Sequence, residues 1–99
     1  MKRFVGTIPK ALQDVWPQLD GCATSQGWSV SPSSTIYKRF YSKGMSMWTN
    51  GSHMTVYLEP LGETTRITMD LSSTTLVDTR RAQKVASKFV EQLGGAILP

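Results

Sequence analysis

The sequence predicts an α+β protein in which a curved, mostly antiparallel sheet packs against two helices, in the order β-α-β-β-β-β-α. Two neighbouring segments, 52–59 and 64–72, alternate apolar and polar residues, as strands covered on one side do. A segment near the C-terminus, 82–93, repeats apolar residues at helical spacing. The 99 residues are 39% hydrophobic, which suits one core. We therefore expect residues 1–99 to form a single α+β domain.

The first third of the chain favours a strand, a helix and a second strand. Residues 3–8 favour a short strand, and Pro9 suits the first position of a helix, where its missing N–H is not needed. Over 9–26 the apolar residues recur three and four apart: Leu12, Val15, Trp16, Leu19, Cys22 and Ala23. Pro17 and Gly21 interrupt this pattern, so we expect a kinked helix or two short ones. Residues 28–31 alternate apolar and polar side chains and favour a short strand.

Three more strands are predicted in the middle of the chain. Residues 35–42 are rich in β-formers. The loop 43–51 follows and contains Asn50-Gly51, a dipeptide that favours a tight hairpin turn. The strands 52–59 and 64–72 are joined by a hairpin loop at 60–63. Their expected buried residues are Met54, Val56, Leu58, Ile67, Met69 and Leu71.

The last helix is the clearest in the sequence. Asp78 or Thr79 would cap it, and Gly94-Gly95 would end it. Its expected buried residues are Ala82, Val85, Ala86, Phe89, Val90 and Leu93. Its other face carries basic residues, and the chain as a whole has a net charge of +4.

Composition excludes several classes of protein. The single cysteine, Cys22, cannot form an internal disulfide, and we expect it to be a small buried hydrophobe. With one cysteine and one histidine, His53, no metal site is expected, and no motif indicates a cofactor. The apolar run after Met1 is too short for a signal peptide, and no apolar stretch is long enough to span a membrane. A cytoplasmic location is therefore expected.

The predicted order resembles the TATA-binding-protein-like and helix-grip group of folds, which includes, in longer form, the lipid-binding START and Bet v 1 superfamily. Short motifs also resemble a group of small uncharacterised bacterial domains. The motifs are Val15-Trp16 on the first helix, Gly27-Trp28 before the second strand, Ser46-Met47-Trp48-Thr49-Asn50-Gly51 in the loop, and Asp78-Thr79-Arg80-Arg81 at the last helix. The resemblance spans nearly the whole chain. It implies a fold and no particular activity.

The resemblance also implies a first functional hypothesis, a small apolar ligand held between the sheet and the last helix. The residues that would line such a site are Trp16, Trp28, Met54, Met69, Val85 and Phe89. Ordinary core packing explains the same residues, and a chain of this length has little volume to spare for a pocket.

The alternative is a basic adaptor that binds nucleic acid or another anionic macromolecule through the sheet face and the last helix. Basic residues interleaved with aromatic ones can bind single strands by phosphate attraction and base stacking. The candidates are Tyr37, Arg39, Tyr41, Tyr57, Arg66, Arg80, Arg81, Lys84 and Lys88. A solvated helix face explains the basic residues equally well. Strand register, which the sequence does not determine, decides whether the sheet residues share a surface.

An enzyme is the least supported reading of the sequence. His53 lies on the polar side of its strand, near Asp70 on the next strand, and any of several serines could complete a triad. That freedom carries no information, and an exposed strand histidine is the simpler interpretation. No catalytic residue is assigned. In the loop 43–49, Met45, Met47 and Trp48 would either form an exposed apolar patch or close one end of the sheet.

Overall fold

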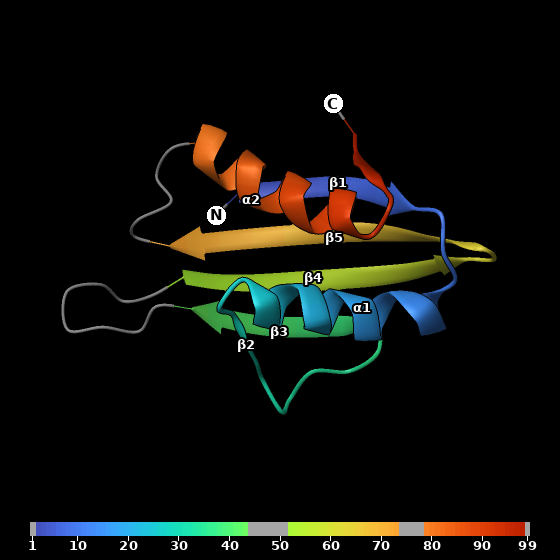
Figure 1. Cartoon of the computed structure of the whole chain (residues 1–99), viewed down its shortest axis with the longest axis horizontal. Helices are drawn as coiled ribbons and strands as arrows, with labels where there is room; N and C mark the ends of the chain where they lie inside the picture. The colour runs from blue at the N-terminus through green and yellow to red at the C-terminus, as the bar shows by residue number, and fades with distance from the viewer. Residues whose placement is uncertain (1, 44–51, 74–78, 99) are drawn as a thin grey trace.

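The computed structural model describes residues 2–43, 52–73 and 79–98, and for Ser73 and residues 79–81 it describes the backbone alone. In chain order the elements are β1 (Lys2–Ile8), α1 (Leu12–Ser25), β2 (Ser29–Val30), β3 (Lys38–Lys43), β4 (Ser52–Leu61), β5 (Thr64–Ser73), α2 (Thr79–Gln92) and β6 (Ala96–Ile97) (Figure 1). The predicted α+β class and element order are confirmed, and one short strand is added at the end.

The described residues form a sheet of six strands in the order β2-β3-β4-β5-β1-β6, and every neighbouring pair is antiparallel. β4 and β5 form the central hairpin, whose tight turn is made at Gly62, with φ of +77°. β1 lies between β5 and β6, so both of its neighbours come from later in the chain.

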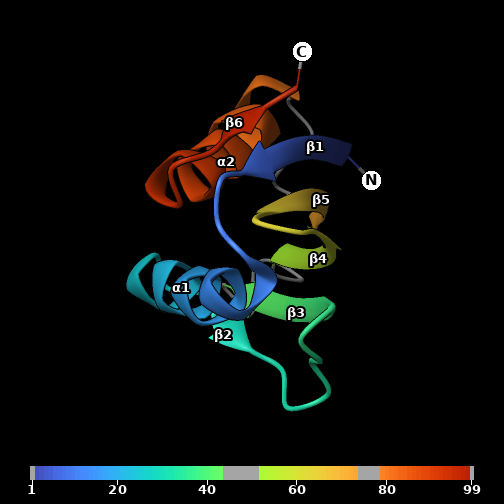
Figure 2. The same ribbon diagram turned by 90° about the vertical axis from the view of Figure 1, so that its right-hand side faces the viewer.

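Both helices cover the same face of the sheet, as the view along the strands shows (Figure 2). The core lies between the two layers. The apolar residues predicted for β4 and β5 are all buried there, α2 contributes Ala82, Ala86, Phe89 and Val90, and Leu93 follows directly after the helix. Val85 is half-buried and packs against this cluster. Within the described ranges, no helix lies on the opposite face of the sheet; we call this the open face.

The start of α1 differs from the prediction, and the helix is continuous. The helix begins at Leu12, not at Pro9, because Lys10 N–H donates to the Ile8 carbonyl and makes a turn off β1. The Lys10 carbonyl accepts a hydrogen bond from Thr65 Oγ1 at 2.8 Å, which fixes this turn to β5. α1 then continues as one helix through Pro17.

The third strand begins later than predicted, at Lys38. Thr35 closes a turn just before it: the Thr35 N–H donates to the Lys38 carbonyl at 2.8 Å, and Lys38 N–H donates to Thr35 Oγ1 at 3.1 Å. The hairpin loop predicted at 60–63 is also shorter, because Pro60 and Leu61 belong to β4.

The sequence did not predict β6. This strand pairs with Gly6 and Thr7 of β1, and the approach is close at Gly95, where an added Cβ would lie 2.3 Å from the Thr7 carbonyl oxygen. A residue without a side chain is therefore required there. The Asp78 cap, the Asn50-Gly51 turn and the loop residues Met45, Met47 and Trp48 lie outside the described residues. None of the described helices combines the length and the apolar composition needed to cross a bilayer.

Candidate binding surface on the open face

The open face carries a cation between two aromatic rings. Lys38 and Phe40 lie two residues apart on β3, and Tyr57 lies opposite Lys38 on β4. The Lys38 Nζ atom is 5.1 Å from the centroid of the Phe40 ring and 5.2 Å from that of the Tyr57 ring. Phe40 is half-buried, whereas Lys38 and Tyr57 are exposed. We call these three residues the Lys38 cluster. The cluster presents a charge and a ring to solvent together.

The carboxylates of the open face are already neutralised. Asp70 accepts two hydrogen bonds from Arg3, at 2.7 and 2.8 Å, and Glu59 accepts one from Arg66 at 3.2 Å. The hydrogen bonds from Arg3 lower the pKa of Asp70, against the opposing effect of burial. Arg3 and Arg66 are thus paired with carboxylates, whereas Lys38, alone among the described lysines and arginines of this face, is not. Its charge remains available to an anionic ligand.

A pocket of about 380 Å³ adjoins the Lys38 cluster. Phe40 and Ser42 of β3 and their opposite residues Thr55 and His53 of β4 lie at its base, and the β2–β3 connection rims it. The described lining residues are Ser31, Ser33, Phe40, Tyr41, Ser42, His53, Met54 and Thr55. We call it the β3–β4 pocket. Because the side chains of Tyr41 and Met54 are buried on the other side of the sheet, the pocket offers hydroxyls, the His53 imidazole and the Phe40 ring.

The sheet residues predicted to bind anions do not share one surface. Tyr57 and Arg66 lie on the open face, and Tyr37 is exposed just before β3. Arg39 and Tyr41 point the other way, toward α1, where their relative exposures are 7% and 2%. The register that the sequence left open therefore separates Arg39 and Tyr41 from the other three.

Arg39 and Tyr41 instead bind Asp20 of α1. Asp20 accepts hydrogen bonds from Arg39 Nε at 3.0 Å, from Arg39 Nη2, and from the Tyr41 hydroxyl at 2.6 Å. The Arg39 guanidinium also lies 5.2 Å from the Trp16 ring centroid. Burial, and then the hydrogen bond to Asp20, raise the pKa of Tyr41 well above its usual value. The three residues join α1 to β3 and leave no free charge for a ligand.

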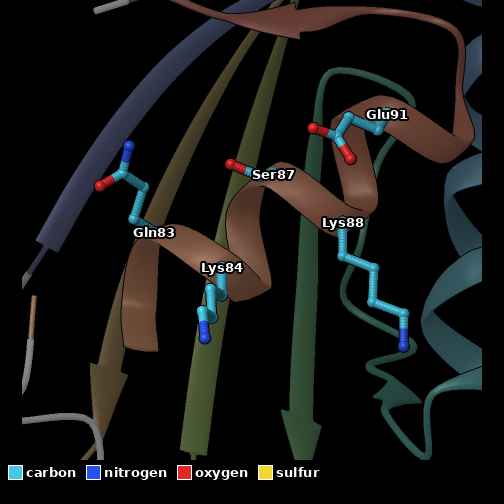
Figure 3. Close-up of a pocket in the computed structure, with 5 residues that line it drawn as sticks. All are labelled: Gln83, Lys84, Ser87, Lys88 and Glu91. Atoms are coloured by element: carbon cyan, nitrogen blue, oxygen red, sulfur yellow. The ribbon is translucent and has the colours of Figure 1, made fainter. Parts of the chain in front are cut away.

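The basic residues of α2 lie on the far side of the sheet from the Lys38 cluster. Lys84 and Lys88 are exposed and help to line a shallow pocket of about 480 Å³ on the outer side of the helix. Figure 3 shows both lysines extending away from Glu91. The other lining residues are Gln83 and Ser87. The Arg80 and Arg81 side chains are outside the description. The open face and the basic side of α2 therefore lie on opposite sides of the sheet and do not form one continuous binding surface.

The six residues proposed to line an apolar site belong to the packed interior. Trp28, Met54, Met69 and Phe89 have relative exposures of 4% or less, and Trp16 and Val85 pack against the same cluster. The Trp28 and Phe89 rings meet edge to face, with centroids 6.2 Å apart. Core packing thus accounts for all six, and ligand binding by them stays a prediction.

The remaining reactive side chains show no catalytic arrangement among the described residues. His53 is exposed and lies opposite Ser42 and Ser72, while Asp70 lies opposite Thr55 and is held by Arg3. Cys22 is buried, its thiol donates to Gln92 Oε1 at 2.7 Å, and burial raises its pKa. No three potential metal-ligating residues gather within the described ranges.

A solved structure shares this fold. The crystal structure of a conserved protein from Geobacillus kaustophilus matches with a TM-score of 0.54, and the match covers 93% of this chain and 92% of that one. The two sequences are 14% identical, so the likeness concerns the fold and transfers no ligand or activity. No protein-family model matches this sequence, and no curated protein does. The resemblance to helix-grip folds stays a prediction.

Proposed function

We propose that this protein is a binding module for single-stranded nucleic acid and that the open face of its sheet is the binding surface. The observation that carries the proposal is the Lys38 cluster. A lysine attracts the phosphate backbone, and an exposed ring such as Tyr57 offers a base a surface on which to stack. In the cluster the Lys38 Nζ atom and the Tyr57 ring centroid, which come from neighbouring strands, are 5.2 Å apart.

The surroundings of the cluster support an anionic ligand. The two carboxylates found on this face in the described part of the chain, Asp70 and Glu59, are occupied by Arg3 and Arg66, so neither repels a phosphate as a free charge would. The face is not covered by either helix (Figure 2). Several hydroxyls lie along it, and hydroxyl groups commonly donate to phosphate and sugar oxygens.

Fluorescence polarisation of labelled single-stranded oligonucleotides tests the proposal. We expect binding at low salt that weakens as salt rises, because phosphate contacts release counterions. Tyr57→Ala should weaken binding by roughly 5- to 150-fold, the range for loss of one stacked base. Lys38→Ala should lower the salt dependence by about 0.7 in the slope of log K against log salt.

Lys84→Ala on α2 is the matched control, because it removes an equal charge from the other side of the sheet. This variant should bind as the unmodified protein does. A loss of binding in Lys84→Ala with none in Lys38→Ala and Tyr57→Ala would move the interaction to α2 and overturn the proposal. Absence of binding at low salt would overturn it as well.

A further inference from the structure

The β3–β4 pocket adds a second feature to the open face. Phe40 belongs both to this pocket and to the Lys38 cluster. A ligand that contacts Phe40 in the cluster is therefore next to the pocket. The volume of about 380 Å³ is in the range of pockets that hold small molecules.

The chemistry of the pocket differs from that of the cluster. Its described lining contains no lysine, arginine, aspartate or glutamate. Ser31 and Ser33 are linked by a hydrogen bond of 2.8 Å between their hydroxyls, and Ser33 N–H donates to Ser31 Oγ at 3.2 Å. Ser42 and His53 face each other across the β3–β4 ladder. The pocket is thus suited to a neutral, flat group with hydrogen-bonding edges.

A nucleotide carries both kinds of group, a charged phosphate and a neutral flat base. We propose that the β3–β4 pocket receives one base of the bound strand and that His53 and Ser42 contact its hydrogen-bonding edge. This inference rests on the proposed function and adds base preference to it. Single-stranded recognition of this kind combines stacking of an unstacked base with hydrogen bonds to its edges.

A phosphate is the weaker candidate for the pocket. Phosphate sites in proteins usually supply a fixed cation or a helix N-terminus, and the described lining has neither. A purely apolar group is also a poor match, because it would leave the hydroxyls of Ser42 and Thr55 without water or partners.

The experiment compares affinities for homopolymeric single strands of each base. The unmodified protein should prefer one base over the least favoured by about 10-fold or more, the discrimination expected of good edge contacts. His53→Ala and Ser42→Ala should remove that preference and bind all four homopolymers with the affinity of the least favoured one. Circular dichroism melts establish that the variants are folded.

Ser72→Ala is the matched control. Ser42 and Ser72 lie on either side of His53 on the open face, but only Ser42 lines the pocket. Ser72→Ala should therefore keep the base preference. The chain has a single histidine, so its imidazole NMR signals report on this pocket without ambiguity. They should shift with the preferred homopolymer and stay in place with inorganic phosphate.

The outcomes separate the two proposals. Equal affinity of the unmodified protein for all homopolymers, with the Tyr57→Ala defect intact, would overturn base reading and leave the proposed function standing. If His53→Ala lost the same amount of affinity for every homopolymer, His53 would contact the sugar-phosphate backbone of the strand. That result would also overturn base reading. No binding of any strand would overturn both.

Discussion

At the scale of single residues, adjacent positions of β3 carry the same charge into opposite environments. Lys38 projects onto the open face between two rings, whereas Arg39 is buried against α1 and bound by Asp20. The alternation of a strand requires this separation. Alternation predicts that Tyr37, Arg39 and Tyr41 share one strand face, and Arg39 and Tyr41 do, whereas Tyr37 lies before β3 and is exposed. The sequence did not indicate which side α1 covers. The indication it missed is Asp20, a carboxylate on the helix that needs a basic partner.

The Asp20 ion pair is expected to be important for stability. Asp20→Asn removes the charge that balances a guanidinium with 8% side-chain exposure and leaves that guanidinium without a compensating charge. Loss of one partner of a buried pair costs roughly 3 kcal/mol in unfolding free energy. Asp14→Asn, on the exposed side of the same helix, should cost less than about 1 kcal/mol. Urea denaturation measures both. Similar losses in the two variants would contradict a special role for Asp20.

The pair between Arg3 and Asp70 predicts a pH dependence. A carboxyl group whose pKa is lower in the folded state stabilises the fold above its unfolded pKa and loses that contribution as pH falls through its folded pKa. Asp70 is such a group. The difference in unfolding free energy between the unmodified protein and Asp70→Asn should be largest at neutral pH and shrink below about pH 4. Urea denaturation across this pH range should show the same trend for Arg3→Gln. If the difference in unfolding free energy grew toward acid pH instead, the stabilising role of the Arg3–Asp70 pair would be refuted.

At the scale of elements, α1 shows how packing overrides local propensity. Pro17 removes one internal hydrogen bond, yet the helix continues, because Val15, Leu19, Cys22 and Ala23 all bury their side chains on the sheet. The sequence contained both signals, the proline and the apolar stripe. It did not show that the stripe would be the stronger of the two.

Two glycine substitutions should have opposite effects on unfolding free energy. An alanine Cβ at Gly21, in α1, would meet nothing within 4 Å, so Gly21→Ala should stabilise the protein by about 1 kcal/mol. At Gly95 the same Cβ would lie 2.3 Å from the Thr7 carbonyl oxygen, so Gly95→Ala should destabilise by roughly 1–3 kcal/mol. Thermal melts of the two variants give the comparison. A stable Gly95→Ala protein would mean that β6 is not held against β1 as described.

The last strand was missed for a simple physical reason. β6 has two residues, too few for an alternation of side chains to be visible, and its formation depends on the approach of β1. In strands as long as β4 and β5, with ten residues each, the alternation of apolar and polar residues shows which face is buried. Short edge strands are specified by their neighbours.

At the scale of the whole molecule, the sequence predicted the class, the element order and the core. It also predicted a sheet covered on one side only, and α1 and α2 do lie on one face, with the basic side of α2 opposite the Lys38 cluster. It could not predict the register of the strands, such as Arg3 opposite Asp70, because register depends on long-range pairing and no local pattern encodes it. The candidate site was therefore predicted only in part: Tyr57 and Arg66 were named, whereas Phe40, Ser42 and Lys38 were not assigned to it.

Phe89 provides a test of the packed interior. Its side chain is fully buried and contacts the Trp28 ring edge to face. Phe89→Ala should lower the unfolding free energy by roughly 3–5 kcal/mol, because it removes apolar contacts and leaves a cavity. Chemical denaturation gives the value. A loss below about 1 kcal/mol would mean that the interior already has room for a ligand, in favour of the apolar-ligand hypothesis.

The position of β1 between β5 and β6 also has a consequence for synthesis. β1 leaves the ribosome before its partners: it has none until Thr65 and the residues after it have been made, and its outer edge waits for Ala96. Until then its apolar side chains and backbone groups are unpaired, in the state most prone to wrong association. Completion of the sheet is therefore delayed until β6 has been made, and a nascent chain stalled before β5 cannot hold this fold.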